Sequence, residues 1–97
     1  MVDFMTIENK TDNKYLDILI KDAFNRMPYP YNNPHITVKD YDLDRVYLDV
    51  DGEEFNIRTW NILDIDTTKI EIEYTLFKVL SEGYYKIYKD KTLVIYK

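Results

Sequence analysis

Carboxylates are the most abundant reactive side chains in this chain of 97 residues, and they gather in its middle. Asp and Glu number 18 against 13 Lys and Arg, which gives a net charge of −5. Residues 40–82 hold twelve of these acids and four of the bases, a local net charge of −8. Two clusters stand out, the triplet Asp40, Asp42 and Asp44 and the run Asp49-Val50-Asp51-Gly52-Glu53-Glu54. Carboxylates at this density can bind a hard cation, carry out acid–base catalysis, or face a positive protein surface.

The spacing of the carboxylates does not fit cation binding. If Gly52 took the sixth position of a calcium loop, Tyr47 would take the first and Arg58 the twelfth, and neither is a carboxylate. A strand is expected to begin directly after the Asp40–Asp44 triplet, so no later carboxylate completes the ligand set within the same loop. The chain also has no Cys, which excludes a thiolate zinc site and a disulfide framework. No metal or other cofactor is therefore expected.

Groups for catalysis are equally scarce. His35 and Ser81 are the only His and the only Ser, so a Ser-His-Asp triad would need both, and no Gly-x-Ser-x-Gly turn surrounds Ser81. Gly52 and Gly83 are the only glycines, too few for a loop that cradles phosphate. We therefore expect no enzymatic activity and assign no catalytic residue.

Net charge and hydrophobicity also exclude some classes of binding partner. An acidic chain with a pI near 4.7 is repelled by nucleic-acid backbones and anionic lipid, so direct nucleic-acid binding is not expected. No run approaches the ~18 apolar residues of a membrane span, and the first residues lack the features of a secretory signal. We expect no membrane association and a cytoplasmic location, which is the host cytoplasm if a phage encodes the chain. The choice between monomer and homodimer stays open.

The first element that must position these groups is a helix from about Asn13 to Met27. Asp12 or Asn13 can cap its start, and Pro28 ends it because the residue before a proline is pushed out of helical geometry. Apolar residues recur at helical spacing at Leu16, Leu19, Ile20, Ala23, Phe24 and Met27. One face of this helix is therefore expected to be buried.

Two alternating runs around Asp51-Gly52 predict a β-hairpin that carries the second acidic cluster. Asp-Gly is the pair that a two-residue type I′ turn requires. With that turn Leu48 pairs with Phe55, and the apolar side chains share one face, which consists of Val46, Leu48, Val50, Phe55 and Ile57. The other face carries Tyr47, Asp49, Glu54, Asn56, Arg58 and Trp60.

Shorter sequence patterns predict the structure of the segments that precede the hairpin. Residues 28–34 hold three prolines and predict an extended connection. His35–Lys39 is expected to be a strand that leads into the acidic turn Asp40–Asp44. A brief alternation over Val2, Phe4 and Thr6 suggests an additional strand at the start.

Residues 68–82 allow two interpretations. Thr68 with Glu71 forms a capping box and Gly83 is a suitable stop, which favours a helix. Ile72, Tyr74 and their neighbours also alternate as in a strand. We expect a helix, because both caps are present and the segment is long for a strand.

The remaining segments, Tyr84–Lys89 and Thr92–Lys97, predict a second hairpin around Asp90-Lys91. The predicted fold class is then α+β, a small single domain over residues 1–97. It has an N-terminal helix, a mainly antiparallel sheet of about five strands, and a second helix near residues 68–82.

These observations predict a non-catalytic acidic protein-binding domain, an inhibitor that occupies a basic, nucleic-acid-binding surface of a partner protein. Phage counter-defence proteins (anti-CRISPR or anti-restriction), immunity proteins and antitoxins share this size, charge and lack of catalytic groups. In the derived register Asp49 lies opposite Glu54, a like-charge pair that stability alone does not require. The residues expected to contact the partner are Asp40, Asp42, Asp44, Asp49, Asp51, Glu53, Glu54, Tyr29, Tyr31 and Trp60.

Two alternatives stay open at this point. The acidic tip can be a solvated turn that protects sheet edges and aids solubility, with the aromatic residues covering the edge of the core. The C-terminal hairpin mixes Tyr84, Tyr85 and Tyr88 with Lys86 and Lys89, the combination that single-stranded nucleic-acid sites use. In that case the chain would be a nucleic-acid or assembly accessory protein.

Overall fold

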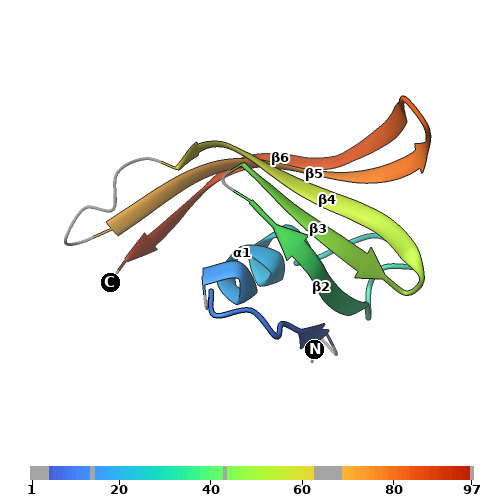
Figure 1. Ribbon diagram of the computed structural model, residues 1–97, viewed down its shortest axis with the longest axis horizontal. Coiled ribbons are helices and arrows are strands. Elements are labelled where there is room, and N and C mark those ends of the chain that lie inside the picture. The colour runs from blue at the N-terminus through green and yellow to red at the C-terminus, as the bar shows by residue number, and fades with distance from the viewer. Residues whose placement is uncertain (1–4, 14, 43, 63–68, 97) are drawn as a thin grey trace.

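The computed structural model describes residues 5–13, 15–42, 44–62 and 69–96, which form one helix and one six-stranded sheet (Figure 1). The elements are β1 (Thr6–Glu8), α1 (Tyr15–Ala23), β2 (His35–Tyr41), β3 (Arg45–Val50), β4 (Glu53–Ile62), β5 (Lys69–Ser81) and β6 (Tyr84–Tyr96). The strands lie in chain order; β1 is parallel to β2, and every other neighbouring pair is antiparallel. The α+β class and the mainly antiparallel sheet are confirmed, whereas the sheet has six strands instead of about five.

The helix forms where its apolar spacing predicts, but it is shorter. Asn13 is the cap, since its Oδ1 accepts a hydrogen bond from the Tyr15 amide at 3.0 Å. The helix ends at Ala23, four residues before Met27, and a turn follows in which Arg26 takes a positive φ of 58°. Lys89 donates to the Asp22 and Asn25 carbonyl oxygens at 3.0 and 2.9 Å. This lysine from β6 supplies donors that the last helical turn lacks, a contact that the local sequence does not reveal.

The β3–β4 hairpin has the predicted register. Val46 pairs with Ile57, Leu48 with Phe55 and Asp49 with Glu54. Asp51 and Gly52 have φ values of 52° and 87°, the two positive angles of a type I′ turn. All five side chains predicted to face inward are buried, at 3% exposure or less.

The second predicted helix is wrong, because β5 occupies residues 69–81. Ile72, Tyr74 and Leu76 are buried in alternation, and the strand pairs with β4 on one side and β6 on the other. Hydrogen bonding on both sides outweighs the local capping signals, of which Thr68 lies outside the described residues. Gly83, with a φ of 81°, belongs to the turn between β5 and β6 instead of a helix end.

The predicted C-terminal hairpin is also wrong. β6 continues without a break from Tyr84 to Tyr96, and Asp90 and Lys91 lie inside it, opposite Thr75 and Tyr74. Lys91 contacts Asp22 of α1 at 3.0 Å, so the position that the sequence suggested as a turn faces the helix. The hairpin of this region is formed by β5 and β6, which project together at one end of the sheet (Figure 1).

Strand signals near the N-terminus are partly confirmed. β1 begins at Thr6, the last residue of the predicted run, while Val2 and Phe4 lie outside the described residues. His35–Lys39 is a strand as predicted, and it continues to Tyr41. The proline-rich segment has neither helix nor strand and includes a cis Tyr29–Pro30 peptide bond.

The two faces of the sheet differ. α1 packs on one of them, here called the covered face (Figure 1), and together they bury a cluster built around Leu19, Ile20, Leu48, Phe55 and Leu76. The opposite face, here called the open face, carries no helix in the described part of the chain. Burial of a large apolar side chain stabilises a fold by roughly 1.5–3 kcal/mol. The packing of α1 on the covered face therefore stabilises this fold, while no described helix occupies the open face.

Candidate functional site

The tip of the β3–β4 hairpin brings three predicted carboxylates together. Asp49 and Glu54 face each other across the strands, and Asp51 lies in the turn between them. The Asp49 Oδ1 accepts a hydrogen bond from the Gly52 amide at 2.9 Å, and the Asp51 Oδ1 accepts one from the His35 amide at 3.1 Å. These bonds shape the turn and leave the charges facing solvent. We call Asp49, Asp51 and Glu54 the acidic tip.

Glu53 belongs to the same run but has a structural role. It lies opposite Val50 on the covered face, where its Oε1 is 2.7 Å from Lys78 Nζ. The Tyr31 hydroxyl donates to Oε2, and Lys78 also donates to that hydroxyl at 2.8 Å. The hydrogen bond from Lys78, followed by that from Tyr31, lowers the pKa of Glu53, while burial is the main cause that raises the pKa of Tyr31. Glu53 is therefore neutralised by its neighbours.

Two residues of the other predicted cluster, Asp42 and Asp44, lie at the far end of β3. Asp40 ends up in β2, and Asp42 and Asp44 lie in the connection to β3. The Asp42 Oδ1 accepts hydrogen bonds from the Asp44 and Arg45 amides at 3.2 and 3.1 Å, and those from Asp44 are the main cause that lowers the pKa of Asp42. About 17 Å of strand separates Asp42 and Asp44 from the acidic tip, whereas Asp40 pairs with Tyr47, two residues from Asp49. The structure therefore divides the predicted acidic site into two.

The three predicted aromatic contacts also separate. Tyr31 is 4% exposed and packs edge-on against Phe55, with ring centroids 5.0 Å apart. Tyr29, two residues earlier, is 87% exposed. Trp60 lies where the pairing of β4 and β5 shifts register, and its side chain lies outside the described part of the structure. Of the three, Tyr29 is the one whose described side chain is open to a partner.

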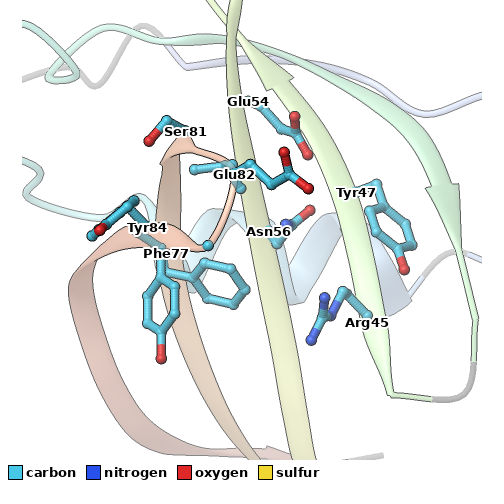
Figure 2. Close-up of a pocket in the computed structure, with 11 residues that line it drawn as sticks. Arg45, Tyr47, Glu54, Asn56, Phe77, Ser81, Glu82 and Tyr84 are labelled. Atoms are coloured by element: carbon cyan, nitrogen blue, oxygen red, sulfur yellow. The ribbon is translucent and has the colours of Figure 1, made fainter.

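A pocket on the open face adjoins the acidic tip (Figure 2). Sequence analysis did not identify this pocket. It has a volume of about 290 Å3 and opens between β3, β4 and the β5–β6 turn. Its walls include polar residues of the hairpin, Arg45, Tyr47, Glu54 and Asn56, and residues at the β5–β6 end, Phe77, Ser81, Glu82, Tyr84 and Tyr85. The sequence placed Asn56 and Glu54 on one face, but it could not bring Glu82 to them while β5 was expected to be a helix.

Asn56 is the unusual residue of this pocket. Its side chain is 3% exposed, and its Oδ1 is buried without a hydrogen-bond partner in the described structure. An unpaired buried acceptor of this kind destabilises a fold by about 1–3 kcal/mol. Native structures pair nearly all such atoms, so an exception calls for an explanation.

The charges of the pocket lie on two sides of Asn56. Figure 2 shows the Glu54 and Glu82 carboxylates on one side and the Arg45 guanidinium on the other. Arg45 lies over the Phe77 ring, 5.7 Å from its centroid, and Phe77 packs against Tyr85 at 5.2 Å. No ion pair joins Glu54 or Glu82 to a cation within the described residues. The pocket thus combines a negative side, a buried acceptor and aromatic walls.

The lysines near the C-terminus are largely engaged within the fold. Lys89 binds the end of α1, Lys91 pairs with Asp22, and Lys86 lies 4.8 Å from the centroid of the Tyr88 ring. Tyr84 and Tyr85 are 70% and 61% exposed. Among the described lysines of this strand, Lys89 and Lys91 are thus bound to α1 instead of lying free beside the exposed aromatic side chains.

Known proteins offer no guide to this site. Comparison with protein-family models, with curated proteins and with solved structures finds no match to this chain. Within the described residues, no group of three or more His, Asp or Glu side chains could hold a metal ion. The described helix is also too short to cross a bilayer.

Proposed function

We propose that this chain is a non-catalytic protein-binding domain whose acidic tip occupies a basic surface of a partner. The observation that carries the proposal is the Asp49–Glu54 pair on the open face. Like charges directly opposite each other in a sheet destabilise it by up to about 1 kcal/mol. Asp51 adds a third carboxylate at the same tip.

Carboxylates on the covered face support this proposal, because they are paired with lysines. On the covered face Glu53 is paired with Lys78 at 2.7 Å and Asp22 with Lys91 at 3.0 Å. At the acidic tip no described lysine or arginine pairs with Asp49, Asp51 or Glu54. The chain therefore supplies cations where acids serve the fold and leaves the tip uncompensated, as expected for a surface that receives cations from elsewhere.

A fixed array of carboxylates suits an inhibitor of a nucleic-acid-binding protein. Such a partner exposes lysines and arginines for phosphate, and complementary charge accelerates association and selects the correct partner. Tyr84 and Tyr85, which line the pocket with Glu54, and the exposed Tyr29 of the connection before β2 would add the apolar contacts that provide most of the affinity. Phage counter-defence proteins, immunity proteins and antitoxins are the classes that match this chemistry.

The test begins with capture of the partner from an extract of the source cell and its purification. Association rates are then measured at low and high salt for the wild type and for the triple variant Asp49→Asn, Asp51→Asn, Glu54→Gln. Each replacement keeps the side-chain shape, and Asn can still accept the turn hydrogen bonds. We expect the variant to associate about tenfold more slowly at low salt and to lose most of the salt dependence.

A second triple variant controls for net charge. Asp12→Asn, Asp42→Asn and Asp44→Asn remove three charges, one before α1 and two in the β2–β3 connection. A smaller reduction in rate is expected, since none of these residues belongs to the acidic tip, and Asp42 and Asp44 lie about 17 Å of strand away from it. Equal rates and equal salt slopes for the wild type and the tip variant would reject the proposal.

A further inference from the structure

The pocket on the open face holds an acceptor that the chain itself does not satisfy. Asn56 is 3% exposed, and its Oδ1 has no partner among the described residues. The Arg45 guanidinium and the Tyr47 hydroxyl belong to the same pocket. Donors of the chain are thus close by but do not reach the atom. A donor that enters the pocket can supply the missing bond.

The neighbouring groups define the charge of that donor. Glu54 and Glu82 contribute two carboxylates to the pocket, and Figure 2 shows both on the same side of Asn56. An anion or a neutral acceptor would meet three acceptor groups with nothing to donate to them. A cation with several N–H groups satisfies all three at once.

The aromatic walls define its shape. Arg45 already lies over the Phe77 ring, and the exposed rings of Tyr84 and Tyr85 line the same pocket. A planar guanidinium stacks on such rings while its five donors point outward in the plane, whereas an ammonium is a compact, strongly hydrated charge. The volume of about 290 Å3 accommodates the end of an arginine side chain.

We propose that this pocket receives an arginine side chain from the basic surface of the partner. The guanidinium donates to Asn56 Oδ1 and to the Glu54 and Glu82 carboxylates and lies against the aromatic wall. Arg45, on the other side of Asn56, opposes the incoming charge. The inference deepens the proposed function and rests on it for the source of the arginine, while the pocket itself can be tested alone.

The direct test is an NMR titration of the whole chain with N-acetyl-arginine amide. The Asn56 side-chain amide and the backbone amides of Phe77 and Gly83 should shift in a saturable way, with a dissociation constant of about 1–10 mM. The citrulline analogue has nearly the same shape without the charge, and it should bind about tenfold more weakly or not at all. The lysine analogue should also bind more weakly. Absence of saturable shifts with arginine, or equal binding of all three probes, would overturn the proposal.

Single variants give effects of opposite sign on the same titration. Asn56→Leu should abolish binding, and Glu82→Gln should weaken it severalfold. Arg45→Gln should tighten it, because a repelling charge is removed. Asp12→Asn, an exposed acid remote in sequence from these elements, should leave the affinity within twofold. If Arg45→Gln and Glu82→Gln shifted the affinity in the same direction, the charge argument would fail.

The two proposals can fail separately. If the arginine probe does not bind but the acidic-tip variant still slows association with the partner, the pocket inference falls and the proposed function stands. If the probe binds and the tip variant associates like the wild type, the pocket is a guanidinium site and the acidic tip is a solvated turn. A melting curve for Asn56→Leu shows that the variant is folded before its binding is measured.

Discussion

The covered and open faces of the sheet treat polar groups in opposite ways. On the covered face two carboxylates each have a lysine and a tyrosine as partners, Asp22 with Lys91 and Tyr74, and Glu53 with Lys78 and Tyr31. On the open face Asp49 and Glu54 face each other, and Asn56 holds a buried acceptor that no described residue pairs with. The chain thus provides hydrogen-bond and ion-pair partners for the polar groups on which the fold depends. The unsatisfied groups collect on the face that is free to meet another molecule.

The largest predicted difference between the two faces is the loss of stability when a core aromatic side chain is removed. Phe55 is fully buried on the covered face and contacts Phe24, Tyr31 and Tyr88. Phe55→Ala should lower the free energy of unfolding by about 3–5 kcal/mol, through lost burial and the cavity left behind. Tyr47→Ala on the open face should cost under about 1 kcal/mol, because that side chain is half-exposed. Urea denaturation of both variants checks the difference, and similar midpoints would contradict the assignment of faces.

A smaller effect of opposite sign is expected at Asn56. Asn56→Leu removes an unpaired buried acceptor and replaces it with an apolar group, so the free energy of unfolding should rise by about 1 kcal/mol. Thermal melting is the measurement, with Thr59→Val as a control for a buried polar residue of the same strand. A clear loss of stability in Asn56→Leu would mean that the amide serves the fold, and the contrast between the faces would weaken.

The smallest predicted effect is the contribution of Glu53, on the covered face, to the pH dependence of stability. The pKa of Glu53 lies below its ordinary value of 4.5 because Lys78 and then Tyr31 donate to its carboxylate. A carboxyl group whose pKa is lowered on folding stabilises the protein above its unfolded pKa, and that contribution is lost as pH falls through the folded pKa. Glu53→Gln should therefore reduce stability at pH 7 and flatten its decline below about pH 4.5. The wild type measured in parallel is the reference, and identical pH profiles for the two proteins would contradict the stabilisation of Glu53 by Lys78 and Tyr31.

Sequence reasoning worked best where local chemistry and pattern agree. The Asp51-Gly52 pair specifies the turn, and the alternation on either side specifies the register, so the hairpin and its inward face were predictable. The apolar spacing of α1 was equally informative, although its end was set by Lys89 from β6, which is distant in sequence. Such a contact leaves no local signal.

The errors share one physical cause. Residues 68–82 carry both a capping box and an alternation, and pairing with strands on both sides decided between them. Because β5 was expected to be a helix, Glu82 and Phe77 were not placed beside Asn56, and the pocket was missed. The carboxylates of the acidic tip were predictable from sequence, but the neutralisation of Glu53 by Lys78 was not, since it joins residues of two strands.

The most direct test of the central claim is NMR cross-saturation of the complex with the purified partner. In this experiment the amides that lie at the interface lose intensity when the partner is irradiated. We predict the largest losses at the acidic tip, around Asp51, Gly52 and Glu54, and at the pocket, around Glu82 and Gly83, with α1 unaffected. Losses confined to the exposed side of α1, at Ile18 and Lys21, with an undisturbed tip and pocket, would contradict the claim that the open face is the binding face.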